Sequence, residues 1–183
     1  MYCIALLQGM VFYGPIAMLY RQAQGISVLQ ITIIESISLA LCLLLELPWG
    51  ILADKIGYKR TMVFCCGLYF ASKIVFWQAD DFAAFLLERV ILSVVIAGLS
   101  GVDTSILYLS CEKDIKQHVF GIYNSLQTTG LLVAALVFSV AVGDNYKLAA
   151  CLTVVSYGIA ALLSVGLSEV YPEESSCSSA GDF

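Results

Sequence analysis

The sequence predicts an all-α membrane protein in which six transmembrane helices form one bundle. Of its 183 residues, 60% are hydrophobic and only 13% are charged. A soluble domain typically carries about 25% charged residues, so this chain cannot cover its surface with polar side chains. Apolar runs of ~20 residues, the length that crosses a bilayer, recur along it. We therefore expect the lipid bilayer to be its main solvent.

Composition also argues against several partners and cofactors. The net charge is −5 and no basic run with interleaved aromatic residues occurs, so we expect no nucleic-acid partner. The seven cysteines accompany a single histidine, His118, and show no zinc-site spacing. No phosphate-binding Gly-Lys-Ser or Gly-Lys-Thr is present. We expect no metal, no cofactor and no ATP-driven mechanism.

Six segments have the character of spanning helices. Three of them are essentially uncharged runs and the other three contain one to three charges each. The connections between them are short, which places consecutive helices antiparallel in one bundle over residues 1–168. The predicted helices cover about 2–20, 27–53, 61–79, 82–109, 118–142 and 147–168.

The first predicted helix, 2–20, carries no charge and has no basic leader, unlike a cleaved signal peptide. We expect the run Phe12-Tyr13-Gly14-Pro15 to kink it. Proline is tolerated in a transmembrane helix because neighbouring helices can satisfy the freed carbonyl group.

The basic residues predict the orientation of the bundle. With the amino terminus inside, the cytoplasmic loops hold five Lys or Arg residues and the outer loops hold two, as the positive-inside rule requires. Both ends are then cytoplasmic, and we expect the cell membrane as location. The polar segment 169–183 would be a cytoplasmic tail or the start of a central linker. The inner residues are Lys55, Lys59, Arg60, Lys113 and Lys116, and the outer ones are Arg21 and Lys147.

The connection between the second and third helices combines glycines with charges. Gly50 lacks a side chain, which would let another helix approach closely, and Gly57 allows a left-handed turn. Asp54 lies at a helix carboxyl end, where a carboxylate opposes the helix dipole. We therefore expect Asp54 to have a compensating partner: Lys55, Arg60 or the amino end of a neighbouring helix.

This segment resembles the signature loop between helices 2 and 3 of the major facilitator superfamily, GxLaDrxGrkxxl. Tyr58 departs from the pattern at a position that is often basic. The preceding Glu46-Leu47-Pro48-Trp49-Gly50 is similar to the Glu-x-Pro-x-Gly approach common in that superfamily. The matching residues are Gly50, Leu52, Ala53, Asp54, Lys55, Gly57, Lys59 and Met62.

The resemblance implies a secondary transporter that moves a small solute by alternating access. This chain would supply the amino-terminal half, built from two inverted three-helix repeats. Its partner would be a carboxy-terminal six-helix half, in the same chain or a second copy. The loop would act as a cytoplasmic gate through Gly50, Asp54, Lys55, Gly57, Lys59 and Arg60.

Four charged residues are predicted at one depth in the membrane. Glu35, Lys73, Glu88 and Arg89 each lie about seven or eight residues from an outer helix end, roughly 10–12 Å deep at ~1.5 Å per residue. A charge at membrane depth costs at least ~2.5 kcal/mol, so each needs a reason. Two interpretations stay open: a structural salt-bridge network, or a substrate or proton site.

The fourth helix also carries a polar stripe. Arg89 and Asp103 are offset by only ~40° around the axis, so they share a face that must avoid lipid. We hypothesise that Arg89 recognises an anionic substrate group and that Asp103 serves in coupling or binding. The alternative is that Asp103 hydrogen-bonds a neighbouring helix. Asn124 and Gln127 on the fifth helix are interhelical bonding groups or further substrate contacts.

Two other classes of protein are weighed against the transporter interpretation. Gly98-Leu99-Ser100-Gly101 resembles the nucleophile motif of rhomboid intramembrane proteases, but a serine nucleophile needs a base within reach. The only histidine, His118, is expected near the cytoplasmic side, so we expect no enzyme. The chain could instead be a non-transporting six-helix subunit or a truncated transporter fragment, which the sequence beyond Phe183 would distinguish. The substrate and the direction of transport stay open.

Overall fold

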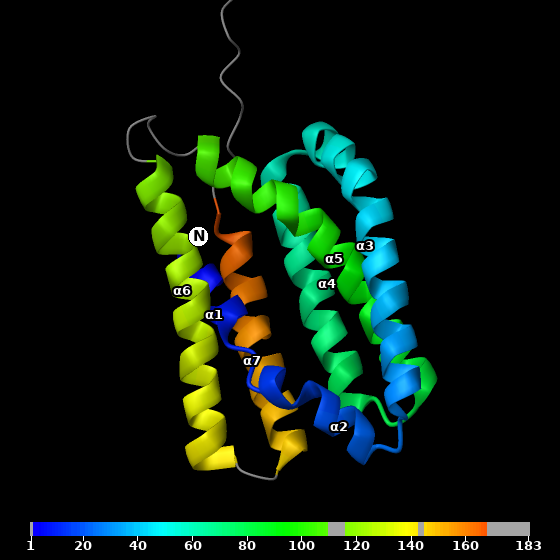
Figure 1. The fold of residues 1–183 in the computed structure, drawn as a ribbon. Helices are drawn as coiled ribbons and strands as arrows, with labels where there is room; N and C mark the ends of the chain where they lie inside the picture. The colour runs from blue at the N-terminus through cyan, green and yellow to red at the C-terminus, as the bar shows by residue number, and fades with distance from the viewer. Residues whose placement is uncertain (1, 110–115, 143–144, 168–183) are drawn as a thin grey trace, which may run out of the picture.

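The computed structural model describes residues 2–109, 116–142 and 145–167 (Figure 1). Within these ranges every regular element is helical. The predicted tail, 169–183, lies outside the described residues, as does the position of Lys113. The elements are α1 Tyr2–Gly9, the 3-10 turn η1 Gly14–Ile16, α2 Ala17–Ala23, α3 Val28–Ile56, α4 Tyr58–Gln78, α5 Phe82–Leu109, α6 Lys116–Val137, the π-helical turn η3 Phe138–Val142, and α7 Tyr146–Val165.

Five helices in the described part of the chain are long and apolar enough to cross a membrane. Their lengths reach or exceed the ~20 residues that a bilayer requires. This finding confirms the prediction of an all-α membrane protein. The candidate spans are Val28–Ile56, Tyr58–Gln78, Phe82–Leu107, Gln117–Val140 and Tyr146–Val165.

The segment expected as one helix over 2–20 is instead divided between α1 and α2. Pro15 lies in η1 and cannot continue a regular helix, because it has no N–H and its ring clashes with the carbonyl one turn earlier. The side chains of α7 satisfy the backbone freed near the break. The Phe12 amide donates to Thr153 Oγ1 at 3.1 Å, and Ser156 Oγ donates to the Leu7 carbonyl at 2.8 Å. The chain interruption is thus stabilised from outside the segment.

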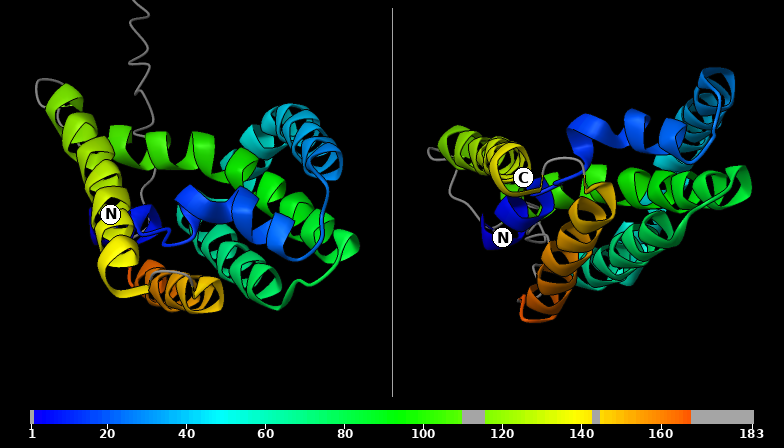
Figure 2. Two further views of the ribbon diagram at one scale, coloured as in Figure 1. Left: turned by 60° about the horizontal axis from the view of Figure 1, so that its bottom comes forward. Right: turned by 90° about the horizontal axis from the view of Figure 1, so that it is seen from below.

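The helices pack in two groups of three. In one group α5 packs against both α3 and α4, and in the other α1 packs against both α6 and α7. Contacts between α4 and α7 join the groups, as the end-on views show (Figure 2). The fourth predicted helix, α5, therefore lies inside its group, which suits the polar stripe that it carries.

Two glycines allow α1 and α6 to cross in backbone contact. A Cβ atom added at Gly9 would lie 2.2 Å from the Gln127 carbonyl oxygen, and one added at Gly130 would lie 2.3 Å from the Leu6 carbonyl oxygen. Small residues permit such approaches between membrane helices. The crossing brings Gln127 of α6 close to the end of α1.

A single glycine joins α3 to α4. Gly57 has φ 98° and ψ 143°, a conformation that residues with a side chain rarely adopt. The predicted reversal at Gly57 is therefore present, and the α3–α4 turn lies at the end of the bundle opposite α2 (Figure 1).

We expect Gly57→Ala to lower the free energy of unfolding by about 1–2 kcal/mol, because alanine is strained at positive φ. Unfolding titration in mixed detergent micelles measures this loss. Gly67→Ala is the matched control, since a Cβ there meets no atom within 4 Å and Gly67 lies inside α4. An equal effect of both substitutions would contradict the strain argument.

Candidate functional site

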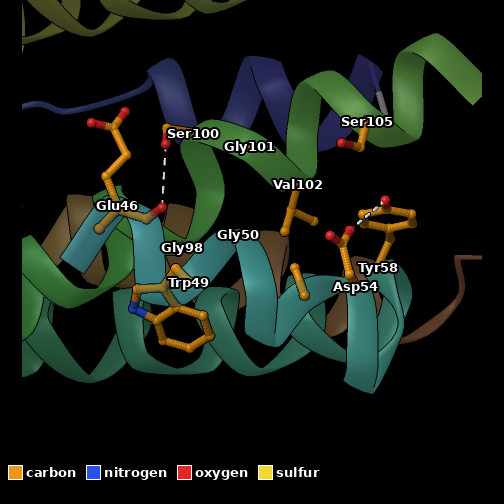
Figure 3. A pocket seen from close by; sticks show the side chains of 12 residues that line it. Glu46, Trp49, Gly50, Asp54, Tyr58, Gly98, Ser100, Gly101, Val102 and Ser105 are labelled. Carbon is orange, nitrogen blue, oxygen red and sulfur yellow. Dashed lines mark hydrogen bonds between the residues drawn. The ribbon is translucent and has the colours of Figure 1, made fainter.

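The α3–α4 hairpin holds Asp54 in a contact that the sequence pattern did not suggest. Asp54 lies in the last turn of α3, and the Tyr58 hydroxyl at the start of α4 donates to its Oδ1 at 2.8 Å (Figure 3). We had expected Lys55, Arg60 or a helix amino end as the compensating partner. The partner is instead Tyr58, the residue that departs from the loop pattern. Its phenol reaches back one helical turn across the hairpin.

A pocket of about 260 Å³ lies between this hairpin and α5. Asp54 and Tyr58 line one side of it, and Ser105 faces them from α5 (Figure 3). Gly50 also borders this hairpin pocket. A Cβ added there would meet no atom within 4 Å, so the close helix approach expected at Gly50 is not found within the described chain.

The basic residues of the hairpin differ in exposure. Lys55 and Arg60 are exposed, and Lys59 is partly buried. Arg60 borders a different, mostly apolar pocket together with Trp49 and Phe64. Lys55 and Arg60 are therefore available for contacts outside the described helices.

Four charged side chains form a closed cluster between α2, α3 and α5. Arg21 contacts Glu35 at 2.7 Å and Glu88 at 3.4 Å, and Arg89 contacts the same two carboxylates at 2.6 and 3.7 Å. Two positive and two negative charges cancel within this ion cluster. Arg21 and Glu88 are almost fully buried. Such mutual pairing allows charges to persist away from water.

This cluster contains three of the four residues predicted for it. Arg21, expected in an outer loop, lies in α2 and pairs with both carboxylates. Lys73 forms no ion pair within 4 Å with a described residue, although its charge still interacts with that of Glu88. Lys73 lies among three tyrosine rings instead, with its Nζ 4.7 to 5.4 Å from their centroids. The Lys73 ammonium also donates to the Tyr13 hydroxyl at 2.9 Å. The other two rings are those of Tyr69 and Tyr157.

Asp103 lines a separate cavity of about 450 Å³. Its Oδ2 accepts a hydrogen bond from the Tyr123 hydroxyl at 2.8 Å, and Gln127 Nε2 donates to that hydroxyl at 3.4 Å. Five elements contribute to this Asp103 cavity: the α1 segment, α4, α5, α6 and α7. Its polar and aromatic lining consists of Gln8, Tyr69, Ser100, Asp103, Gln127, Thr128 and Tyr157.

The polar stripe of α5 is divided between two sites. Arg89 belongs to the ion cluster and Asp103 to its cavity, so the structure does not bring the two together. Gln127 joins Asp103 through Tyr123, whereas Asn124 is exposed and does not border the cavity. The interhelical hydrogen bond considered as the alternative role of Asp103 is present.

Sequence reasoning missed the tyrosines of this region. Tyr123 lies one helical turn before Gln127, so both are on one face of α6. This spacing could have indicated that their side chains bond to each other. Tyr69 and Tyr157 had no such signal, because α4 and α7 are far apart in the chain. Their rings lie 4.5 Å apart at the centroids.

Ser100, weighed above as a protease nucleophile, donates its Oγ hydrogen to the Ala97 carbonyl at 3.2 Å. His118 is exposed near the start of α6. The Ser100 hydroxyl thus engages its own helix backbone, as hydroxyl groups inside helices commonly do.

Apolar helices of spanning length that surround buried charges are typical of an integral membrane protein. The sequence model of the Major Facilitator Superfamily matches residues 1–182, and the chain belongs to this family. No curated protein matched the chain. Members of the family are transporters and not enzymes, so membership implies membrane transport of a solute.

Proposed function

We propose that the chain is the amino-terminal half of a secondary transporter that moves a small solute by alternating access. The observation that carries this proposal is the Asp103 cavity, a space of about 450 Å³ among apolar helices that is lined by one carboxylate and several neutral polar groups. Polar groups at membrane depth are costly and mark solute or ion pathways. Asp103 and Gln127 bind the solute, and an ion gradient or the solute's own gradient supplies the energy.

The packing pattern supports two inverted three-helix repeats. If the α1–α2 segment, α3 and α4 form the first repeat, then α5, α6 and α7 form the second. The contact of α1 with α6 then corresponds to that of α5 with α3, and the contact of α1 with α7 corresponds to that of α5 with α4. The α4–α7 contact lies on the pseudo-twofold axis between them. The α1–α2 segment provides the sixth crossing.

The α3–α4 hairpin acts as the cytoplasmic gate. Its basic residues support a cytoplasmic location through the positive-inside rule, and burial of Arg21 removes one of the two positive charges expected outside. Lys55 and Arg60 are exposed and can engage a carboxy-terminal half, in the same chain or in a second copy. The bond between Tyr58 and Asp54 keeps the hairpin's carboxylate oriented toward α5.

Labelling from both sides of the membrane tests alternating access. Thr128 borders the Asp103 cavity, and Thr129, the next residue of α6, does not. In the native protein in sealed vesicles, we expect Thr128→Cys to react with a membrane-impermeant maleimide in both vesicle orientations. Thr129→Cys is the control for general exposure of α6, and the native cysteines supply the background.

A non-transporting subunit would show a different result. Its cavity would be reached from one side only or from neither, so Thr128→Cys would react in one vesicle orientation at most. That outcome would rule out alternating access through this cavity.

A further inference from the structure

One oxygen of Asp103 lacks a partner. Tyr123 donates to Oδ2, but Oδ1 is buried and has no hydrogen-bond partner among the described residues. A buried carboxylate oxygen without a donor is costly, since the charge is only half compensated. Asp103 also borders the cavity, so its incompletely compensated carboxylate is available to a cation that binds there.

The remaining lining of the cavity contains no opposite charge. Among its described lining residues Asp103 is the only carboxylic acid, and none is Lys or Arg. Gln8, Gln127 and Thr128 offer neutral polar groups, while aliphatic side chains and the rings of Tyr69 and Tyr157 cover most of the rest. The site therefore combines one net negative charge with a largely apolar wall.

The cations nearest in the fold are already engaged. Arg89 shares Glu35 and Glu88 with Arg21 in the ion cluster. Lys73 donates to Tyr13 behind the rings of Tyr69 and Tyr157 and does not itself border the cavity. No ion pair of Asp103 with a described residue lies within 4 Å, so its charge is open to an external cation.

We propose that the Asp103 cavity binds a small organic amine in its protonated form, with the ammonium group paired to the Asp103 carboxylate. This inference rests on the proposed function, in which the cavity is the solute site, and names the solute class. The ammonium donates a charge-assisted hydrogen bond to the carboxylate, and the apolar body of the amine packs against Leu99, Leu131 and the tyrosines. The earlier hypothesis of an anionic group at Arg89 is replaced, because Arg89 does not reach this cavity.

Three molecules with one ring system and three charges test the solute class. Tryptamine is a cation near neutral pH, tryptophol is neutral and indole-3-acetate is an anion. Each is added to the purified native protein in detergent, and the melting temperature is followed with a thiol-reactive dye. We expect tryptamine to raise the melting temperature in proportion to its occupancy. Tryptophol should require at least about tenfold more for the same shift, and indole-3-acetate should give none.

Two variants test whether the shift in melting temperature comes from tryptamine bound in the Asp103 cavity. Asp103→Asn keeps an oxygen for the Tyr123 hydroxyl but removes the charge, and should weaken the response to tryptamine at least about tenfold. Asp80→Asn, an exposed position in the α4–α5 connection, is the matched control. If Asp103→Asn does not fold, Thr128→Trp fills the cavity from α6 while leaving Asp103 intact, and should abolish the response.

The outcomes decide the proposal without ambiguity. An equal or larger shift with indole-3-acetate, no shift with tryptamine up to millimolar concentration, or a tryptamine shift that persists in both cavity variants would overturn it. These results are independent of the labelling of Thr128→Cys. Two-sided labelling with no amine response removes only the solute class, and an Asp103-dependent amine response with one-sided labelling removes only transport.

Discussion

Replacing Glu88 by glutamine is expected to lower the free energy of unfolding by about 3–5 kcal/mol. Glu88 is almost fully buried and shares Arg21 and Arg89 with Glu35. Its loss leaves two guanidinium groups for a single carboxylate, one of them deep inside the bundle. An uncompensated buried charge is among the most destabilising changes that a single substitution can make. Unfolding titration in mixed detergent micelles measures the loss.

A matched substitution and a double variant separate this effect from general damage. Glu46→Gln makes the same chemical change at an exposed position of α3 and should alter stability by about 0.5 kcal/mol or less. Arg21→Met combined with Glu88→Gln leaves Arg89 paired with Glu35. The double variant should therefore lose less than the sum of the single losses. Additive losses would show that the four charges do not act as one cluster.

A methyl group at Gly130 is expected to cost about 2–3 kcal/mol, because it would enter the α1–α6 crossing. The atoms that it meets are backbone: the Leu6 carbonyl oxygen at 2.3 Å and the Gly9 Cα at 3.2 Å. Backbone cannot rotate away as a flexible side chain can, so α1 must shift. The loss should exceed the gain of up to about 1 kcal/mol that alanine brings to a helix interior.

Gly121→Ala provides the comparison within the same helix, since a Cβ there meets no atom within 4 Å. It should leave stability unchanged or slightly raise it. Because Gly9 and Gln127 lie at the same crossing, Gly130→Ala should also loosen the wall of the Asp103 cavity. Equal melting temperatures for Gly130→Ala and Gly121→Ala would show that α1 and α6 do not meet closely.

The α3–α4 hairpin shows how much structure a local sequence pattern can predict. Gly57 was identified from a spacing of glycines and charges, and its positive φ agrees with that interpretation. The partner of Asp54 could not be identified in the same way, because a phenol and a basic group are equally able to reach a carboxylate one turn away. The pattern favoured a basic group, whereas the structure has Tyr58.

The charged residues within the membrane show what position along a helix cannot predict. Depth along each predicted helix placed Glu35, Glu88 and Arg89 together correctly, since depth follows from residue count. It also placed Lys73 near them, and the charges of Lys73 and Glu88 do interact. The ammonium nevertheless lies among tyrosine rings, because depth says nothing about which way a side chain points around its helix. Arg21 was assigned to a loop, and only the course of α2 brings it beneath Glu88, 67 positions away.

The amino-acid sequence alone determined that the chain is an α-helical membrane protein, where its five long helices run and which loop marks its family. These properties follow from local composition, because hydrocarbon selects apolar runs of sufficient length. Tertiary structure decided which polar groups meet: Arg21 in the ion cluster, Lys73 among tyrosines, and Tyr123 on Asp103. Those contacts depend on how helices rotate and cross, and crossing is set by backbone approaches such as Gly9 against Gly130. No single segment contains that information.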